Sequence, residues 1–223
     1  MENICVNNKS WDDYPNLLST TPFNYDVFMK LCPLESRIID IGCGYGRICK
    51  RLENLGYHNI VGLDTSKVQL DRAQKALNFT QLFLINENEA FNFLNASFNC
   101  LITLGVIDCI TDLDKINFFI NECTRIIDDN GYWFINFYTR NDSEYFDLKY
   151  KNGWDEFRSK RVFLAKSGIK FKHYSLLEFI TLIDSCFDVI KCDLIEFLSF
   201  NQINKVKGYS IILKKIKYKS KFR

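Results

Sequence analysis

The chain has 223 residues, of which 47% are hydrophobic and 15% aromatic, a composition typical of a globular domain and not of a disordered chain. Its 29 lysines and arginines stand against 27 aspartates and glutamates, and a net charge of +2 predicts no dominant polyanionic partner. The length fits one domain. No apolar run approaches the ~20 residues of a bilayer-spanning helix, so we expect no membrane contact.

The sequence predicts no targeting segment, zinc-binding cysteine pair or histidine cluster. The opening residues MENICVNNKSWDD contain neither a basic n-region nor an apolar h-region, which predicts a cytoplasmic protein. None of the nine cysteines forms a C-x-x-C pair, so we expect reduced thiols and no zinc site. The two histidines, His58 and His173, are too few for a multi-histidine metal centre, and no metal is expected.

Strand and helix patterns alternate along most of the chain. Residues 1–36 predict a helical N-terminal cap, 37–138 a cofactor-binding core, 139–174 an aromatic lid insertion, 175–216 a closing helix and strands, and 217–223 a basic tail. Strands are expected at 37–41, 59–64, 81–85, 100–106 and 132–138, with helices after the first two and at 112–128. A helix at 175–186 and strands at 187–197 and 208–216 follow. Fully apolar strands in βα units predict a parallel sheet covered on both faces.

A glycine-rich turn follows the first strand. It reads Asp40-Ile41-Gly42-Cys43-Gly44-Tyr45-Gly46 and lies where an open α/β sheet binds its nucleotide. The dinucleotide fingerprint G-x-G-x-x-G needs a third glycine at the position of Arg47. The spacing G-x-G-x-G therefore favours a zwitterionic amino-acid group and a ribose over a pyrophosphate.

An acid ends the second strand. Asp64 follows Gly46 by 18 residues and precedes Thr65 and Ser66. A carboxylate at this place accepts both ribose hydroxyls, although an Asp before Thr-Ser is also an ordinary helix start. Together with the glycine turn, Asp64 predicts a ribose site.

These segments resemble the class I S-adenosylmethionine-dependent methyltransferases, in the small-molecule (type 11/25-like) branch. RIIDIGCGYGRI resembles the first motif, NIVGLDTSKVQLDRAQ the second, and NENEAFNFLNASFNCLITLGVIDCI the third and fourth. The resemblance implies a three-layer Rossmann-like sandwich with a seven-stranded, mostly parallel sheet whose last strand is antiparallel. It implies S-adenosylmethionine as cofactor and S-adenosylhomocysteine as product, held by Asp40, Gly42, Cys43, Gly44, Gly46, Asp64, Thr65, Glu87, Asn88, Leu104 and Gly105.

The catalytic base is less defined by the motifs. Asp108-Cys109 stands where the family commonly has Glu-His, and Glu87 where Asp is common. Asp108, expected to face the cleft, and His173, at the return of the lid, are the two candidates for a general base. In the structural alternatives, Asp108 caps the next segment and His173 packs at a helix entry.

Aromatic residues predict a closed acceptor pocket. Tyr145 and Trp154 lie in the lid insertion, and Trp11 and Tyr14 in the N-terminal segment close over the cofactor or simply pack in the core. The favoured function is methyl transfer to an O or N atom of a small, partly apolar molecule, by a monomer or homodimer. The alternatives are an RNA or protein methyltransferase using the basic tail, with nucleic acid the less favoured partner, and an inactive cofactor-binding subunit.

Overall fold

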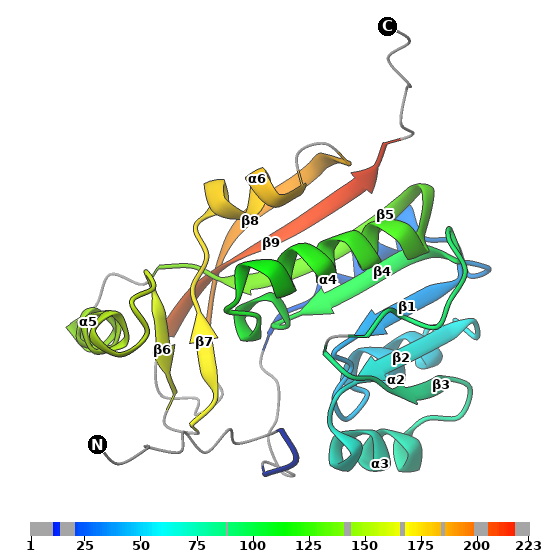
Figure 1. Cartoon of the computed structure of the whole chain (residues 1–223). Helices are drawn as coiled ribbons and strands as arrows, with labels where there is room; N and C mark the ends of the chain where they lie inside the picture. The colour runs from blue at the N-terminus through cyan, green and yellow to red at the C-terminus, as the bar shows by residue number, and fades with distance from the viewer. Residues whose placement is uncertain are drawn as a thin grey trace, which may run out of the picture.

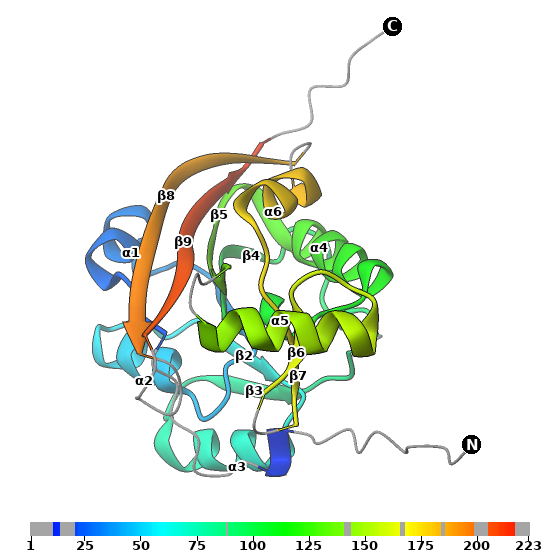
Figure 2. The same cartoon turned by 90° about the vertical axis from the view of Figure 1, so that its left-hand side faces the viewer.

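A computed structural model describes residues 11–13, 21–87, 89–140, 144–165, 168–183, 186–198 and 205–216. Its main feature is a seven-stranded sheet in the order β3-β2-β1-β4-β5-β9-β8, with helices on both faces (Figures 1 and 2). Strands β3, β2, β1, β4 and β5 pair in parallel, whereas β9 runs antiparallel to both β5 and β8. The predicted three-layer sandwich with an antiparallel last strand is confirmed.

The elements follow the predicted alternation. The sheet strands are β1 Ile38–Ile41, β2 Ile60–Asp64, β3 Gln81–Leu84, β4 Phe98–Leu104, β5 Ile127–Tyr138, β8 Phe187–Leu198 and β9 Lys205–Lys215. The α-helices are α1 Tyr25–Leu31, α2 Arg47–Asn54, α3 Lys67–Ala76, α4 Leu113–Ile126, α5 Glu144–Phe157 and α6 Leu176–Ile183. Short 3-10 turns are η1 Trp11–Asp13 and η2 Ile107–Cys109, and a hairpin is formed by β6 Val162–Leu164 and β7 Lys170–Lys172.

Alternation along the buried strands divides the core in two. Ile38 faces a cluster built with α1, α2 and α3, whereas Ile39 and Ile41 face a cluster built with α4 and α6. Successive side chains of a strand point to opposite faces, so an entirely apolar strand such as β1 needs helices on both sides. The strand ends that carry the site are thereby held rigidly from both faces.

The boundary between α4 and β5 differs most from the sequence prediction. Helix α4 ends at Ile126, and β5 begins directly at Ile127, five residues before the predicted start at Tyr132. The early part of β5 contains Asn130 with a positive φ of 65° and a register irregularity against β4. A bulged, polar strand start lacks the apolar run by which strands are recognised in sequence.

The prediction of reduced thiols is wrong for one pair. Cys32, which caps the end of α1, forms a disulfide with Cys100 in β4, 68 residues away. Both residues lie in the core cluster under α1, where helix and strand meet. Among the described residues, Cys43, Cys49, Cys109, Cys123 and Cys192 are free thiols.

The lid insertion forms its own small layer. Helix α5 packs on the β6–β7 hairpin through Gly153, whose added Cβ would lie 1.8 Å from the carbonyl oxygen of Val162. A third apolar cluster joins the lid to Tyr138 at the end of β5. Within the described ranges, no helix combines the length and apolar character that crossing a membrane requires.

Candidate functional site

The glycine turn joins β1 to α2 at the carboxyl edge of the sheet. Gly42, Gly44 and Gly46 all have positive φ, at 75°, 55° and 80°. A Cβ on Gly42 would lie 2.3 Å from Cγ2 of Val106, and one on Gly46 would lie 2.8 Å from Cδ1 of Leu77. An added Cβ on Gly44 meets nothing within 4 Å. Packing therefore requires the outer two glycines, whereas the middle one leaves open space for close approach of a ligand.

Asp64 connects this turn to the end of β2. Its Oδ2 accepts a hydrogen bond from the Gly44 N–H at 2.7 Å, and its Oδ1 accepts one from the Ser66 N–H at 2.8 Å. The carboxyl is nearly buried, and burial raises its pKa while these backbone donors oppose the rise. An ionised carboxylate has about four acceptor sites, so two bonds leave capacity for ligand hydroxyls.

Asp40 lies beneath the turn, in the middle of β1. Its Oδ2 accepts a hydrogen bond from the Cys49 thiol at 3.4 Å. Burial raises the pKa of Asp40 to about 7, and the thiol of Cys49 and the charge of Arg47 limit the rise. A ligand cation close to this carboxyl would favour its charged form.

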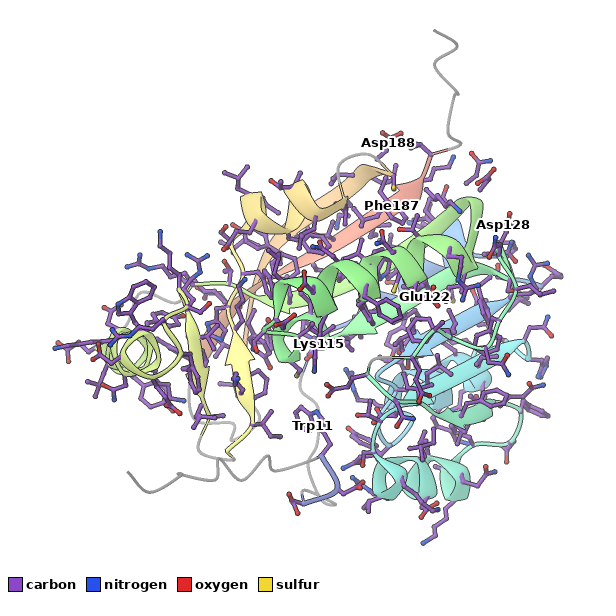
Figure 3. All side chains as sticks on the ribbon, in the orientation of Figure 1. Trp11, Lys115, Glu122, Asp128, Phe187 and Asp188 are labelled. Atoms are coloured by element: carbon purple, nitrogen blue, oxygen red, sulfur yellow. A yellow bond between two sulfur atoms is a disulfide. The ribbon has the colours of Figure 1, made fainter. Side chains whose placement is uncertain are left out.

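The other predicted cofactor residues are distributed around this edge. Cys43 is buried in the turn, Thr65 is exposed after β2, and Leu104 and Gly105 are half-buried at the end of β4. Glu87 is exposed on the β3–β4 loop and pairs with Lys115 at the start of α4, 3.4 Å away (Lys115 in Figure 3). Asn88 lies outside the described residues.

The expectation that Asp108 faces the cleft is wrong. Its side chain is fully buried, and Oδ1 accepts a hydrogen bond from the Tyr138 N–H at 2.7 Å. Burial raises the pKa of this carboxyl well above its usual range, and Oδ2 has no hydrogen-bond partner among the described atoms. A short 3-10 turn after β4 directs the side chain toward β5, where it ties η2 to the last residue of that strand.

His173 lies inside the lid layer rather than on a surface. The Tyr150 hydroxyl is 2.7 Å from its Nδ1, and its ring stacks on Tyr138 with centroids 5.6 Å apart. Burial together with the charges of Lys149 and Arg161 lowers the pKa of His173 to about 3. The ring is consequently neutral near pH 7.

The aromatic candidates occupy different environments. Trp11 packs edge-on against Phe171 of β7 with centroids 6.2 Å apart, and Figure 3 shows it between the lid hairpin and the α3 side of the molecule. Tyr145 and Trp154 of α5 are 37% and 45% exposed. Tyr14 lies outside the described residues, as does the predicted basic tail 217–223.

One residue of the site lacked a sequence signal. Asp12 in η1 accepts hydrogen bonds from the Ser66 hydroxyl at 2.6 Å and the Val68 N–H at 3.1 Å, at the start of α3. Its neighbour Trp11 contacts the lid. The turn η1 thus links the lid to the residues that follow Asp64.

Asn136 in β5 is a second missed residue, but it had a visible signal. It is a buried polar residue within an apolar strand, and its Nδ2 donates to the Pro22 carbonyl at 2.6 Å. Its own carbonyl accepts from the Gly105 N–H at 3.1 Å. Asn136 therefore positions both the N-terminal segment and the turn after β4.

Comparison with known proteins finds a matching family and several relatives of low sequence identity. Residues 39–135 match the family described as "Methyltransferase domain". The ubiquinone biosynthesis O-methyltransferase of Bartonella tribocorum is 29% identical over 124 residues, covering 51% of this chain and 45% of that protein. The eEF1A lysine and N-terminal methyltransferase of Homo sapiens is 26% identical over 124 residues, covering 48% and 18%. The chain thus spans less than half the length of these relatives.

Solved structures show the same fold. The crystal structure of a SAM-dependent methyltransferase from Methanosarcina mazei has a TM-score of 0.81 at 20% identity, covering 88% of this chain and all of that one. A methyltransferase structure from Mesorhizobium loti has a TM-score of 0.62 at 15% identity, with 85% and 96% covered. At these identities the likeness establishes the fold alone.

Proposed function

We propose that the chain, whose residues 39–135 match the methyltransferase domain family, is an S-adenosylmethionine-dependent enzyme that transfers a methyl group to an O or N atom of a small, partly apolar molecule. The observation that carries the proposal is the hydrogen bond that joins the glycine turn to Asp64. Gly44 faces open space while its N–H is held by Asp64 at 2.7 Å, at the carboxyl edge where α/β sheets bind nucleotides.

In this proposal, different residues at the carboxyl edge of the sheet bind different parts of the cofactor. Asp64 accepts the ribose hydroxyls, the open side of Gly44 admits the amino-acid portion, and Asp40 favours its ammonium group. Glu87 and Asn88 provide the adenine contacts, and Leu104 and Gly105 the apolar cover at the end of β4. Bound there, S-adenosylmethionine supplies an electrophilic S-methyl group, so the protein contributes mainly position and exclusion of water.

Neither Asp108 nor His173 acts as a strong general base in the proposed reaction. Burial raises the pKa of Asp108 well above its usual range, and its Oδ1 already accepts a hydrogen bond from the Tyr138 N–H, so Asp108 holds the strand ends rather than accepting a proton. His173 with a pKa of about 3 is neutral but weakly basic, and its Nδ1 already contacts Tyr150. General bases work best when their pKa lies near the working pH, so an acceptor that is ionised or weakly basic is favoured.

Calorimetric titration tests the cofactor assignment. S-Adenosylhomocysteine is expected to bind with micromolar affinity and NADH not to bind. Asp64→Ala removes acceptors for charge-assisted hydrogen bonds and should weaken binding by roughly 100-fold. Asp71→Ala, an exposed acid of α3 that pairs with Lys67, is the matched control and should bind as wild type. Binding of NADH alone, or of neither compound, would contradict the proposal.

A protein acceptor is the second candidate, since some relatives are named eEF1A lysine and N-terminal methyltransferases. The two acceptor classes separate in a radiolabelled transfer assay. Label in protein bands after incubation with a cell extract would favour the protein acceptor, and label in the extract's small-molecule fraction the first proposal. Tight cofactor binding with no labelled product of either class would favour an inactive binding subunit.

A further inference from the structure

A positively charged cavity lies on the lid. Its volume is about 440 Å³, and its charged lining consists of Arg140, Lys151, Lys160, Arg161 and Asp147. Four cations against one carboxylate give this small region a net charge of +3, whereas the entire chain carries only +2. The lining is therefore more positive than the chain as a whole, which is close to neutral.

Aromatic rings complete the lining. Tyr150 and Trp154 share one face of α5 with the cavity's Asp147 and Lys151, because residues three, four and seven apart lie along one side of a helix. Trp154 is 45% exposed although it is a large aromatic residue. Rings beside cations form the lining of a site for a planar ligand with an acidic group.

The cavity begins just beyond the carboxyl end of β5. Arg140 follows β5 by two residues, and Tyr150 contacts His173, which stacks on Tyr138, the last residue of β5. In Figure 2, α5 crosses in front of the sheet on the side where β4 and β5 end. Trp11 and Cys109 pack against the lid cluster to which Tyr150 belongs.

One cation is held in place before any ligand arrives. Arg161 donates from Nε to the His173 carbonyl at 2.8 Å and pairs through Nη2 with Glu178. Glu178 already balances the charge of this guanidinium, so the attraction for an acid comes mainly from the other cations of the lining. The amino groups of Lys151 and Lys160, both on exposed residues, add point charges around it.

We propose that this cavity binds the acidic group and ring of the methyl acceptor, so that the acceptor is a small aromatic acid carrying a carboxylate or a phosphate. The inference rests on the proposed function, which it deepens by naming the acceptor class.

Calorimetry with three probes tests this inference on the full chain: 1-naphthoate, 1-naphthyl phosphate and the neutral 1-naphthamide. S-Adenosylhomocysteine is titrated in parallel. At least one anionic probe is expected to bind about tenfold or more tightly than the amide, and the stronger of the two distinguishes carboxylate from phosphate. The double variant Lys151→Gln/Lys160→Gln should lower that affinity by about tenfold and leave S-adenosylhomocysteine binding unchanged.

Lys75→Gln is the matched control, since Lys75 is an exposed lysine at the end of α3 and outside the cavity. Equal binding of the amide, binding insensitive to the double variant, or no binding of either anion overturns the inference even when S-adenosylhomocysteine binds. Failure of S-adenosylhomocysteine to bind overturns the proposed function instead. The two failures are therefore distinguishable in one set of titrations.

Discussion

Alanine substitutions at Gly44 and Gly46 separate packing from ligand approach within one turn. At Gly46, with φ of 80°, a Cβ would lie 2.8 Å from Cδ1 of Leu77 and 3.2 Å from Cβ of Ala73. The left-handed conformation costs a non-glycine residue about 1–2 kcal/mol and overpacking about 1–3 kcal/mol, so Gly46→Ala should lower the free energy of unfolding by about 3 kcal/mol. At Gly44, with φ of 55° and no atom within 4 Å of the added Cβ, only the conformational cost applies. We expect Gly44→Ala to lose about 1 kcal/mol.

Urea unfolding followed by far-ultraviolet circular dichroism measures both stability losses, and calorimetry with S-adenosylhomocysteine measures binding to the folded variants. Gly44→Ala should lose about tenfold or more in affinity because its methyl group occupies the space through which the ligand approaches. Equal losses of stability in the two variants would refute the packing argument. Affinity equal to wild type in folded Gly44→Ala would refute the assignment of that open side to the cofactor.

Three further substitutions have defined outcomes. Because the folded pKa of Asp40 is about 7, above the 3.8 of a free carboxyl, ionisation of Asp40 destabilises the fold as pH rises between these values. The stability of Asp40→Asn relative to wild type, measured by urea unfolding, should therefore increase as pH rises from about 4 to about 7. A difference that does not change with pH would contradict a buried carboxyl with a raised pKa. Gly153→Ala puts a methyl group 1.8 Å from the carbonyl oxygen of Val162 and should loosen the packing of α5 on the hairpin. Limited proteolysis should then cleave the lid faster than in wild type, while S-adenosylhomocysteine binding persists. An unchanged rate of cleavage would argue against this packing. Thr103→Val removes the acceptor 2.9 Å from Nε1 of the fully buried Trp133 and should cost about 1–3 kcal/mol in thermal or urea unfolding, whereas no loss would mean that the indole N–H finds another partner.

Local patterns in the sequence were sufficient to predict the fold and to identify the glycine turn and Asp64, which the structure brings together. Each short apolar run that was predicted as a strand in the first half of the chain forms one. The glycine turn was recognisable because left-handed backbone and close approach both demand glycine at fixed spacing. Asp64 was recognisable because a strand end in a parallel sheet points its carboxylate toward that turn, and the 2.7 Å bond to Gly44 joins the two.

The catalytic residues could not be assigned in the same way. Asp108 and His173 were placed at the correct ends of their elements, but their burial was not visible in the sequence. A pKa depends on which groups surround a side chain, and for these residues the neighbours come from β5 and α5. Periodicity gives the face of an element but not the partner that covers it.

By itself, then, the sequence determined the order of βα units, the glycine turn and the acid at the end of β2, because backbone geometry and side-chain period act over a few residues. Only the tertiary structure decided the Cys32–Cys100 disulfide, the contact of Asp12 with the start of α3, and the cationic cavity on the lid. Each of these joins segments far apart in the chain. Their proximity follows from how the sheet edge, the N-terminal turn and the lid pack together, and no local pattern encodes that packing.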